Sequence, residues 1–185
     1  MNSLQMSNLK FQMMKISVKI FPVSLILGMV ILLTACTGHG IPVNIQDTLN
    51  KYVECWNTGN FDGIEDILAE DFTLYASPDY RPIRGIDSLK KTITSNLTSF
   101  PDFNLIINET VFQEDKVGAI WTVSGTNTGQ GDMPPTGKAI NGKGLSFIHL
   151  QDGKIKDEWL ANNNLLFMEQ LGFKFTPPTP PDTIK

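Results

Sequence analysis

The order of helix-like and strand-like segments is the feature that most constrains the fold of this chain. Apolar residues recur at helical spacing over residues 45–56, 61–71 and 86–100. Four stretches rich in β-branched and aromatic residues follow, at 103–112, 116–129, 141–150 and 154–162. Helices followed by a run of strands are typical of an α+β domain, so we expect one curved antiparallel sheet with helices packed on one face.

Turn signals place the connections between these segments. The stretch 72–77 predicts one further strand, and the proline-bearing 78–85 predicts a loop. The Asp-Gly pair in "QDGK" predicts a tight hairpin that makes the last two strands antiparallel neighbours. A short final helix is expected over 165–171, ending at Gly172.

The first 35 residues have the pattern of a secretion signal. They contain three lysines and no acidic residue, and the apolar run 21–33 is shorter than the ~20 residues that span a bilayer. The run ends in "LTAC", which resembles a bacterial lipobox and implies a lipid on Cys36; an ordinary signal peptide and an uncleaved anchor helix are the alternatives. The small polar residue after Cys36 favours the outer membrane of the cell envelope, facing the periplasm.

The expected domain organisation follows from this signal. Residues 1–35 form the lipoprotein signal peptide, 36–43 a linker, 44–175 one domain, and 176–185 a proline-rich tail. Removal of the signal leaves 12 basic and 19 acidic residues, a net charge of −7, which disfavours binding to nucleic acid. The remaining cysteine, Cys55, cannot pair with an acylated Cys36, so a packed core must stabilise the domain.

Several common motifs are excluded by their details. The segment "GDMPPTGKA" has five residues between its glycines and an alanine where a phosphate loop needs Ser or Thr. The two histidines, His39 and His149, have no paired carboxylates at ligand spacing, so we expect no metal site. Covalent catalysis has no support either, because the chain contains no Gly-x-Ser-x-Gly elbow.

An ordered series of short motifs resembles one known family. They are "RG" at 84–85, "FPDF" at 100–103, "VSGTNTG" at 123–129, "PPTGK" at 134–138, "DGKI" at 152–155, "DEW" at 157–159 and "QLG" at 170–172. Over residues 44–173 the chain is similar to the SnoaL-like polyketide cyclase (ester cyclase) family of the nuclear-transport-factor-2-like superfamily. The resemblance implies a cone-shaped α+β barrel, in which a strongly bent antiparallel sheet encloses a hydrophobic pocket and helices pack on its concave face. It also implies no cofactor, and a homodimer.

The same resemblance aligns the acid/base aspartate of the family with Asn163. A neutral amide donates and accepts hydrogen bonds but does not take a proton from carbon, so Asn163 cannot be the base. At least one of Asn162, Asn163 and Asn164 is expected to cap the helix that follows, because Asn is a good N-cap. Pocket lining remains open for Asn163, since strand alternation would place it beside Trp159 and Ala161 on the pocket side.

Other residues are candidates for the missing acid/base. His149 is one candidate, because histidine as a residue type suits proton transfer near neutrality. Asp157 and Glu158 lie on opposite faces of the last strand, so one carboxylate points inward. Our catalytic candidates are His149 and Asp157. The ligand-binding candidates are Asn163, Trp159, Trp121, Tyr75 and Trp56, with core packing as the alternative role of the tryptophans.

Two functional hypotheses therefore come from the sequence, and it leaves open whether the protein is an enzyme. The first is a lipid-anchored domain that binds a small hydrophobic or aromatic molecule in its cone. The second is a cofactor-independent cyclase, isomerase or hydrolase in which His149 or an inward carboxylate replaces the aspartate. A third, structural hypothesis is a domain that serves only for dimerisation.

Overall fold

The computed structural model describes residues 43–131 and 134–176. The predicted signal peptide, the lipid site Cys36, the linker before Val43 and the tail after Thr176 lie outside the described residues. Within these ranges, no helix has the length and apolar character needed to cross a membrane. The elements are α3 (Val43–Thr58), α4 (Ile64–Ile67), β1 (Leu68–Ala76), β2 (Pro82–Arg84), α5 (Ile86–Ser99), β3 (Asn104–Gln113), β4 (Lys116–Thr126), β5 (Ala139–Gln151), β6 (Lys154–Asn162) and α6 (Asn164–Gln170).

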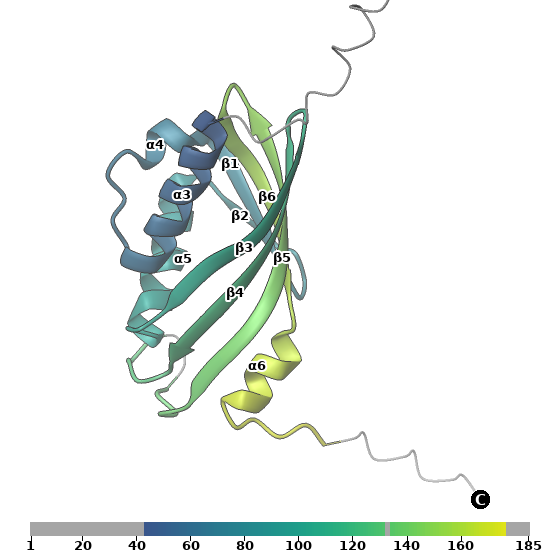
Figure 1. Cartoon of the computed structure of the whole chain (residues 1–185). Coiled ribbons are helices and arrows are strands. Elements are labelled where there is room, and N and C mark those ends of the chain that lie inside the picture. The colour runs from purple at the N-terminus through teal and green to yellow at the C-terminus, as the bar shows by residue number, and fades with distance from the viewer. Residues whose placement is uncertain (1–42, 132–133, 177–185) are drawn as a thin grey trace, which may run out of the picture. The chain divides into compact units, whose positions relative to one another are not determined.

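The six strands form one curled sheet in the order β2-β1-β6-β5-β4-β3, with helices on its concave side (Figure 1). This confirms the predicted α+β fold. The sheet is mixed, however, because β1 and β6 run parallel while the other pairs run antiparallel. A turn determines the relative direction only of the two consecutive strands that it joins. Because β1 and β6 are far apart in the sequence, no turn signal predicts that they run parallel.

The β5–β6 hairpin has the predicted geometry. Asp152 and Gly153 both take positive φ, 53° and 78°, as a two-residue type I′ turn requires. The pairing continues from Gln151 opposite Lys154 to Gly144 opposite Asn162, with a register shift after His149. This shift decides which β6 side chains reach the concave side.

Two local predictions differ from the structure. The helix expected over 61–71 is confined to α4, because the chain enters β1 at Leu68. The β1–β6 register shifts between Leu68 and Thr73, so strand alternation is lost there and the apolar spacing mimics a helix. The loop expected over 78–85 contains the short edge strand β2, which begins with Pro82, a position where a strand tolerates proline.

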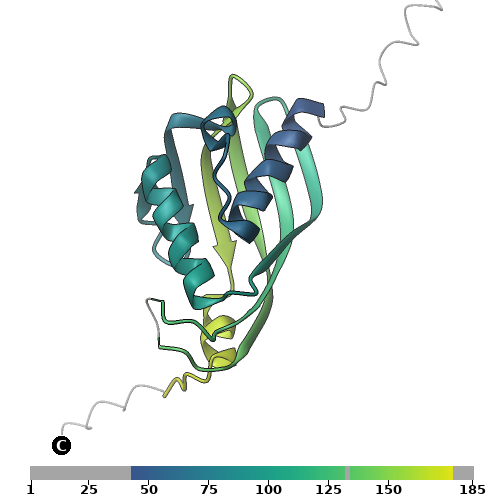
Figure 2. The ribbon, with the colours of Figure 1, turned by 90° about the vertical axis from the view of Figure 1, so that its left-hand side faces the viewer.

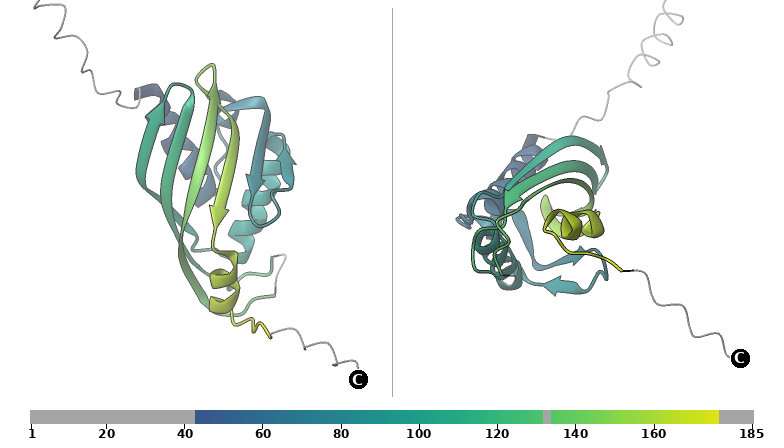
Figure 3. Two further views of the ribbon diagram at one scale, coloured as in Figure 1. Left: turned by 90° about the vertical axis from the view of Figure 1, so that its right-hand side faces the viewer. Right: turned by 90° about the horizontal axis from the view of Figure 1, so that it is seen from below.

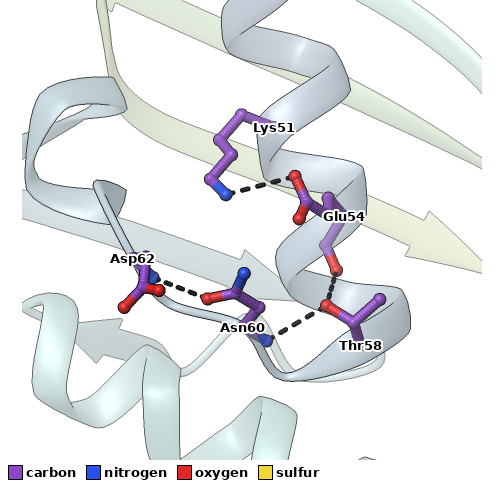
Figure 4. Close-up of polar contacts among 5 residues, drawn as sticks. All are labelled: Lys51, Glu54, Thr58, Asn60 and Asp62. Atoms are coloured by element: carbon purple, nitrogen blue, oxygen red, sulfur yellow. Dashed lines mark hydrogen bonds and ion pairs between the residues drawn. The ribbon is translucent and has the colours of Figure 1, made fainter.

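The end of α3 shows how polar residues stop a helix (Figure 4). Thr58 donates through Oγ1 to the carbonyl of Glu54, and the same oxygen accepts from the backbone N–H of Asn60. Asn60 Oδ1 in turn accepts from the N–H of Asp62 at 3.0 Å. Gly59 between them has φ 68°, a left-handed conformation that glycine adopts without strain. The stretch "NTGN" at 57–60 therefore ends the helix.

Helices α3 and α5 cover the concave face and bury the core against it (Figures 1 and 2). The apolar stripe of α3 packs over β3 and β6, and α5 packs over β1 and β2. Cys55 is fully buried within this layer. The core has these fully buried large side chains: Leu49, Ile64, Leu68, Phe72, Leu74, Leu89, Ile93, Val117 and Ile155.

Helix α6 follows β6 directly and lies at one end of the sheet (Figure 3). Its side chains join a second, smaller apolar cluster that contains Phe100, Ile140 and Leu171, with Phe103 and Phe167 packed against it. Gln170 fastens the helix to β5, since its side-chain amide exchanges two hydrogen bonds with the backbone of Asn141, at 2.9 and 3.0 Å. The sheet, α3, α5 and α6 together surround a cavity.

Candidate functional site

An internal cavity of about 390 Å³ lies between the concave face of the sheet and the helices α3, α5 and α6. This volume is within the range that small-molecule sites occupy, roughly 300–1,000 Å³. The walls are mainly apolar and aromatic. The large apolar lining residues are Leu49, Val53, Trp56, Leu74, Ile83, Phe100, Phe103, Leu105, Ile107, Trp121, Val123, Ile140, Ile148, Leu160, Phe167, Met168 and Leu171.

Two glycines of β5 make room for the aromatic walls. A Cβ on Gly144 would collide with the ring of Trp121, and a Cβ on Gly142 would collide with the ring of Phe167. Both glycines are on the inward side of β5. The "NGKG" stretch is therefore a strand whose inward positions are left empty for rings that line the cavity.

Glu158 of β6 is the carboxyl group that lines the cavity. Its side chain accepts a hydrogen bond from Tyr52 Oη at 2.7 Å and one from Ser146 Oγ at 2.5 Å. Ser146 Oγ also accepts from the indole Nε1 of Trp121 at 2.9 Å. Glu158 is 4% exposed, and α3, β4 and β5 each provide one residue of this network.

Burial sets the ionisation of this network. Desolvation raises the pKa of Glu158 above its ordinary value, although the hydrogen bonds from Ser146 and Tyr52 act in the opposite direction. Burial, followed by the nearby Glu158 charge, raises the pKa of Tyr52, which therefore stays a phenol and a hydrogen-bond donor. The cavity wall thus holds a carboxyl group whose proton affinity is increased and whose geometry is fixed by two hydroxyl groups.

The structure places the predicted catalytic pair on the opposite side of the sheet. His149 Nδ1 and Asp157 Oδ1 are 2.7 Å apart and partly buried, and neither residue lines the cavity. The expectation that Asp157 points into the site is therefore corrected: the inward carboxylate is Glu158. The physical reason is the register shift after His149, which sets which of the two acidic neighbours faces the helices.

The three consecutive asparagines have two different roles, helix capping and cavity lining. Asn163 caps α6, because its Oδ1 accepts from the backbone N–H of Leu166 at 3.0 Å, which confirms the capping prediction. It is absent from the cavity lining, whereas Asn162 and Asn164 are part of it. Both of these bond to the Ser77 hydroxyl, which donates to Asn162 Oδ1 at 2.7 Å and accepts from Asn164 Nδ2 at 3.0 Å.

The aromatic candidates also separate into two groups. Trp56 and Trp121 line the cavity as expected. Tyr75 and Trp159 do not line the cavity. Their rings stack on the far side of the sheet, with 4.1 Å between the ring centroids. The ring of Tyr80 lies beside them, with its centroid 5.9 Å from that of Trp159. The side chains at the end of β6 alternate between the two faces of the sheet, as expected, so Trp159 and Ala161 share one face. That face is the outer one.

This outer face of the sheet is apolar and shallowly grooved. We define it by the outward-pointing residues Tyr75, Val111, Ile120, Leu145, Phe147 and Trp159. Phe147 is 45% exposed and Leu145 is 57% exposed, so large apolar side chains meet solvent across neighbouring strands. A surface of this kind marks an interaction site more often than a catalytic one.

Sequence reasoning missed two members of the cavity wall, Tyr52 and Asn96, and the serine that bonds to Glu158. Tyr52 falls on the apolar stripe of α3 and therefore looked like a core residue. Ser146 was overlooked, although a polar residue at an inward position of β5 is the one available signal for it. Asn96 of α5 also lines the cavity and carried no signal, since Asn is common on exposed helix faces. Among the described residues, no three His, Cys, Asp or Glu side chains gather as a metal site would require.

Comparisons with known proteins agree with this architecture. Residues 46–171 match the model of the SnoaL-like polyketide cyclase family. The aklanonic acid methyl ester cyclase DauD of Streptomyces sp. (strain C5) is 26% identical over 138 residues, which cover 72% of this chain and 84% of that protein.

Solved structures show the same fold. A proposed polyketide cyclase from Bacillus cereus ATCC 10987 is 26% identical, with a TM-score of 0.59 over 70% of this chain and 80% of its own. A proposed SnoaL-like polyketide cyclase from Jannaschia sp. CCS1 reaches a TM-score of 0.66 at 16% identity, over 77% of this chain and 99% of its own. With its curled sheet, its helices on the concave face and its matching residues 46–171, this chain belongs to the SnoaL-like polyketide cyclase family of nuclear-transport-factor-2-like proteins.

Proposed function

We propose that this domain binds a small hydrophobic or aromatic molecule in its internal cavity. The observation that carries the proposal is the apolar chamber of about 390 Å³ that α3, α5 and α6 close over the sheet. Aromatic rings from α3, β4 and α6 offer flat walls, and burial of apolar ligand surface supplies the binding free energy, roughly 25 cal/mol per Å².

Native mass spectrometry of protein purified from its own host tests this proposal. We expect a small-molecule adduct that is lost on denaturation. The variant Val53→Trp fills part of the cavity from α3 and should lose the adduct. Leu145→Trp, which adds a similar volume on the outer face, should keep it. If the wild-type protein carries no adduct and binds no added aromatic probe, the proposal is wrong.

A second candidate function is cofactor-independent acid–base catalysis of the cyclase or isomerase type, with Glu158 as the proton-transferring group. The specific observation in its favour is a cavity-lining carboxyl with a raised pKa, held by hydrogen bonds from Tyr52 and Ser146. A carboxyl of this kind takes and returns a proton closer to neutral pH than an exposed one does. In this proposal Glu158 replaces the aspartate that the family resemblance aligns with Asn163.

Turnover of aklanonic acid methyl ester is a suitable assay, because a relative is named for cyclising it. We expect Glu158→Gln to abolish any turnover while it keeps ligand binding, since the amide retains size but does not accept the proton. Asn163→Asp should leave turnover unchanged, because residue 163 caps α6 outside the cavity. Full turnover by Glu158→Gln would rule out this catalytic role.

We also propose that the mature protein is lipid-anchored through Cys36, at the outer membrane facing the periplasm. The support is the lipobox-like "LTAC" after a short apolar run. Mass spectrometry of the membrane fraction should show a lipid on Cys36, and Cys36→Ala should release the domain from membranes. A mature chain that lacks Cys36 would contradict the anchor.

For assembly, we propose that a second copy of this chain covers the outer face and forms a homodimer. Exposed apolar side chains span neighbouring strands, and the edge of the face carries both signs, with Glu109 and Lys143 on one side and Lys116 on the other. A two-fold arrangement lets opposite charges meet around an apolar centre. Light scattering should give a dimer that Phe147→Lys converts to monomer; a monomeric wild-type protein would refute this assembly.

A further inference from the structure

A chain of two hydrogen bonds connects a tryptophan with the carboxyl group of Glu158. The indole Nε1 of Trp121 donates to Ser146 Oγ at 2.9 Å, and Ser146 Oγ donates to Glu158 Oε1 at 2.5 Å. Tyr52 Oη donates to the other carboxyl oxygen, Oε2, at 2.7 Å. Each oxygen of Glu158 therefore has its own hydroxyl donor, and the donor on Oε1 is itself the acceptor of an indole N–H.

The β5 residues Gly144 and Ser146 fix the position of the Trp121 ring. Both lie on the inward side of β5, because side chains alternate along a strand. A Cβ on Gly144 would lie 2.0 Å from the ring, so the glycine leaves the space that the ring fills. The hydroxyl two residues further along the strand receives the indole N–H. Trp121 and Ser146 are each 5% exposed, so contacts within the protein hold this arrangement without an occupant of the cavity.

The chemistry of the indole sets the direction of the Ser146 proton. An indole N–H donates and cannot accept, so the single proton of the Ser146 hydroxyl points away from Trp121 and toward Glu158 Oε1. A hydroxyl that accepts one hydrogen bond also donates a stronger one. Burial raises the pKa of Glu158, and the hydrogen bond from Ser146 is the largest of the effects that lower it. Trp121 and Ser146 therefore favour the ionised carboxyl in a place where burial favours the protonated one.

We propose that Trp121 is a positioning residue, which acts through Ser146 to keep the buried Glu158 able to release its proton. The inference rests on the second proposed function, in which Glu158 transfers protons, and it names the residues that adjust that group. When the O–H bond of Glu158 breaks, its proton passes to an external base and the negative charge stays on the carboxylate. The Ser146 O–H stabilises that charge, while the Trp121 N–H stays on Ser146 Oγ. This role is separate from the apolar wall that the Trp121 ring provides.

The titration of Glu158 in adduct-free protein tests the proposal. Carbon-13 NMR of protein labelled at glutamate Cδ follows the carboxyl group, and Glu158→Gln identifies its signal. Ser146→Ala should lower the acid dissociation constant of Glu158 about five- to tenfold, because a hydrogen bond to a charged acceptor is stronger than one to a neutral acceptor.

Two replacements of Trp121 isolate its N–H. One is β-(3-benzothienyl)alanine, in which a sulfur atom takes the place of the N–H and the ring keeps its size; the other is Trp121→Phe. Each should lower the dissociation constant of Glu158 by about 1.3- to 4-fold, because Ser146 becomes a weaker donor. Either change should have no further effect once Ser146 is alanine. Benzothienylalanine in place of Trp159, whose ring lies on the outer face, is the matched control and should leave the titration at the wild-type value.

Three outcomes would overturn this role of Trp121. They are a dissociation constant unchanged by the benzothienyl ring at residue 121, a further decrease when that ring is added to Ser146→Ala, and a wild-type Glu158 that keeps its proton up to the pH of unfolding. The titration uses no substrate, so it is independent of turnover. If Glu158→Gln abolishes turnover and the Trp121 variants titrate like wild type, the catalytic function stands and this inference alone is refuted. Full turnover by Glu158→Gln refutes the catalytic function whatever the titration shows.

Discussion

The contribution of Glu158 to the stability of this protein should fall as pH rises. Its pKa is raised in the folded state by burial, whereas an unfolded glutamate titrates near its ordinary pKa of 4.5. Below that pH the group is protonated in both states, so its contribution to stability is fully present. Above it, the unfolded chain releases a proton that the folded chain retains, so the free energy of unfolding decreases. The loss is complete once the pH passes the folded-state pKa.

The magnitude follows from linkage. One retained proton lowers the free energy of unfolding by about 1.4 kcal/mol per pH unit, and the fall levels off above the folded-state pKa. The variant Glu158→Gln removes this titration and keeps a neutral side chain of the same shape. Its carbonyl accepts from Tyr52 and its amide donates to Ser146, so we expect a cost of roughly 1 kcal/mol or less at pH 4.5.

Urea denaturation from pH 4.5 to 9, followed by tryptophan fluorescence, measures the difference in the free energy of unfolding between wild type and Glu158→Gln. We expect wild type and Glu158→Gln to be close at pH 4.5, and the variant to become the more stable protein as pH rises. Glu158→Leu should instead be about 2–5 kcal/mol less stable at pH 4.5, because the Tyr52 and Ser146 hydroxyls lose a buried acceptor. A difference between wild type and Glu158→Gln that stays constant with pH would refute the reasoning.

Three further predictions concern other parts of the site. Asn163→Ala should lower the free energy of unfolding by about 1 kcal/mol while Asn163→Asp stays near wild type, as thermal denaturation will show, because aspartate caps a helix equally well. Gly144→Ala should displace the ring of Trp121, with loss of the small-molecule adduct in native mass spectrometry and a changed fluorescence spectrum, since a Cβ collides with that ring. His149→Ala and Asp157→Ala should each change stability by less than about 1 kcal/mol and leave retention of the small-molecule adduct unchanged, because their partly exposed contact lies outside the cavity.

The sequence by itself determined the elements whose causes are local. Helical spacing placed α3 and α5, and the apolar and β-branched runs placed β3 to β6, since each pattern reflects the repeat of its own element. The Asp-Gly pair set the β5–β6 turn, and the asparagine run predicted a cap that Asn163 provides, because turn and cap chemistry depends on a few adjacent residues.

Only the tertiary structure decided which side chains meet. Whether Asp157 or Glu158 points inward depends on a register shift between paired strands, and one residue of shift exchanges the two faces. The same register shift places Trp159 on the outer face. The parallel direction of β1 beside β6 depends on pairing between segments that are distant in the sequence. The network that holds Glu158 unites four elements across up to 106 residues of sequence, a separation over which no local pattern carries information.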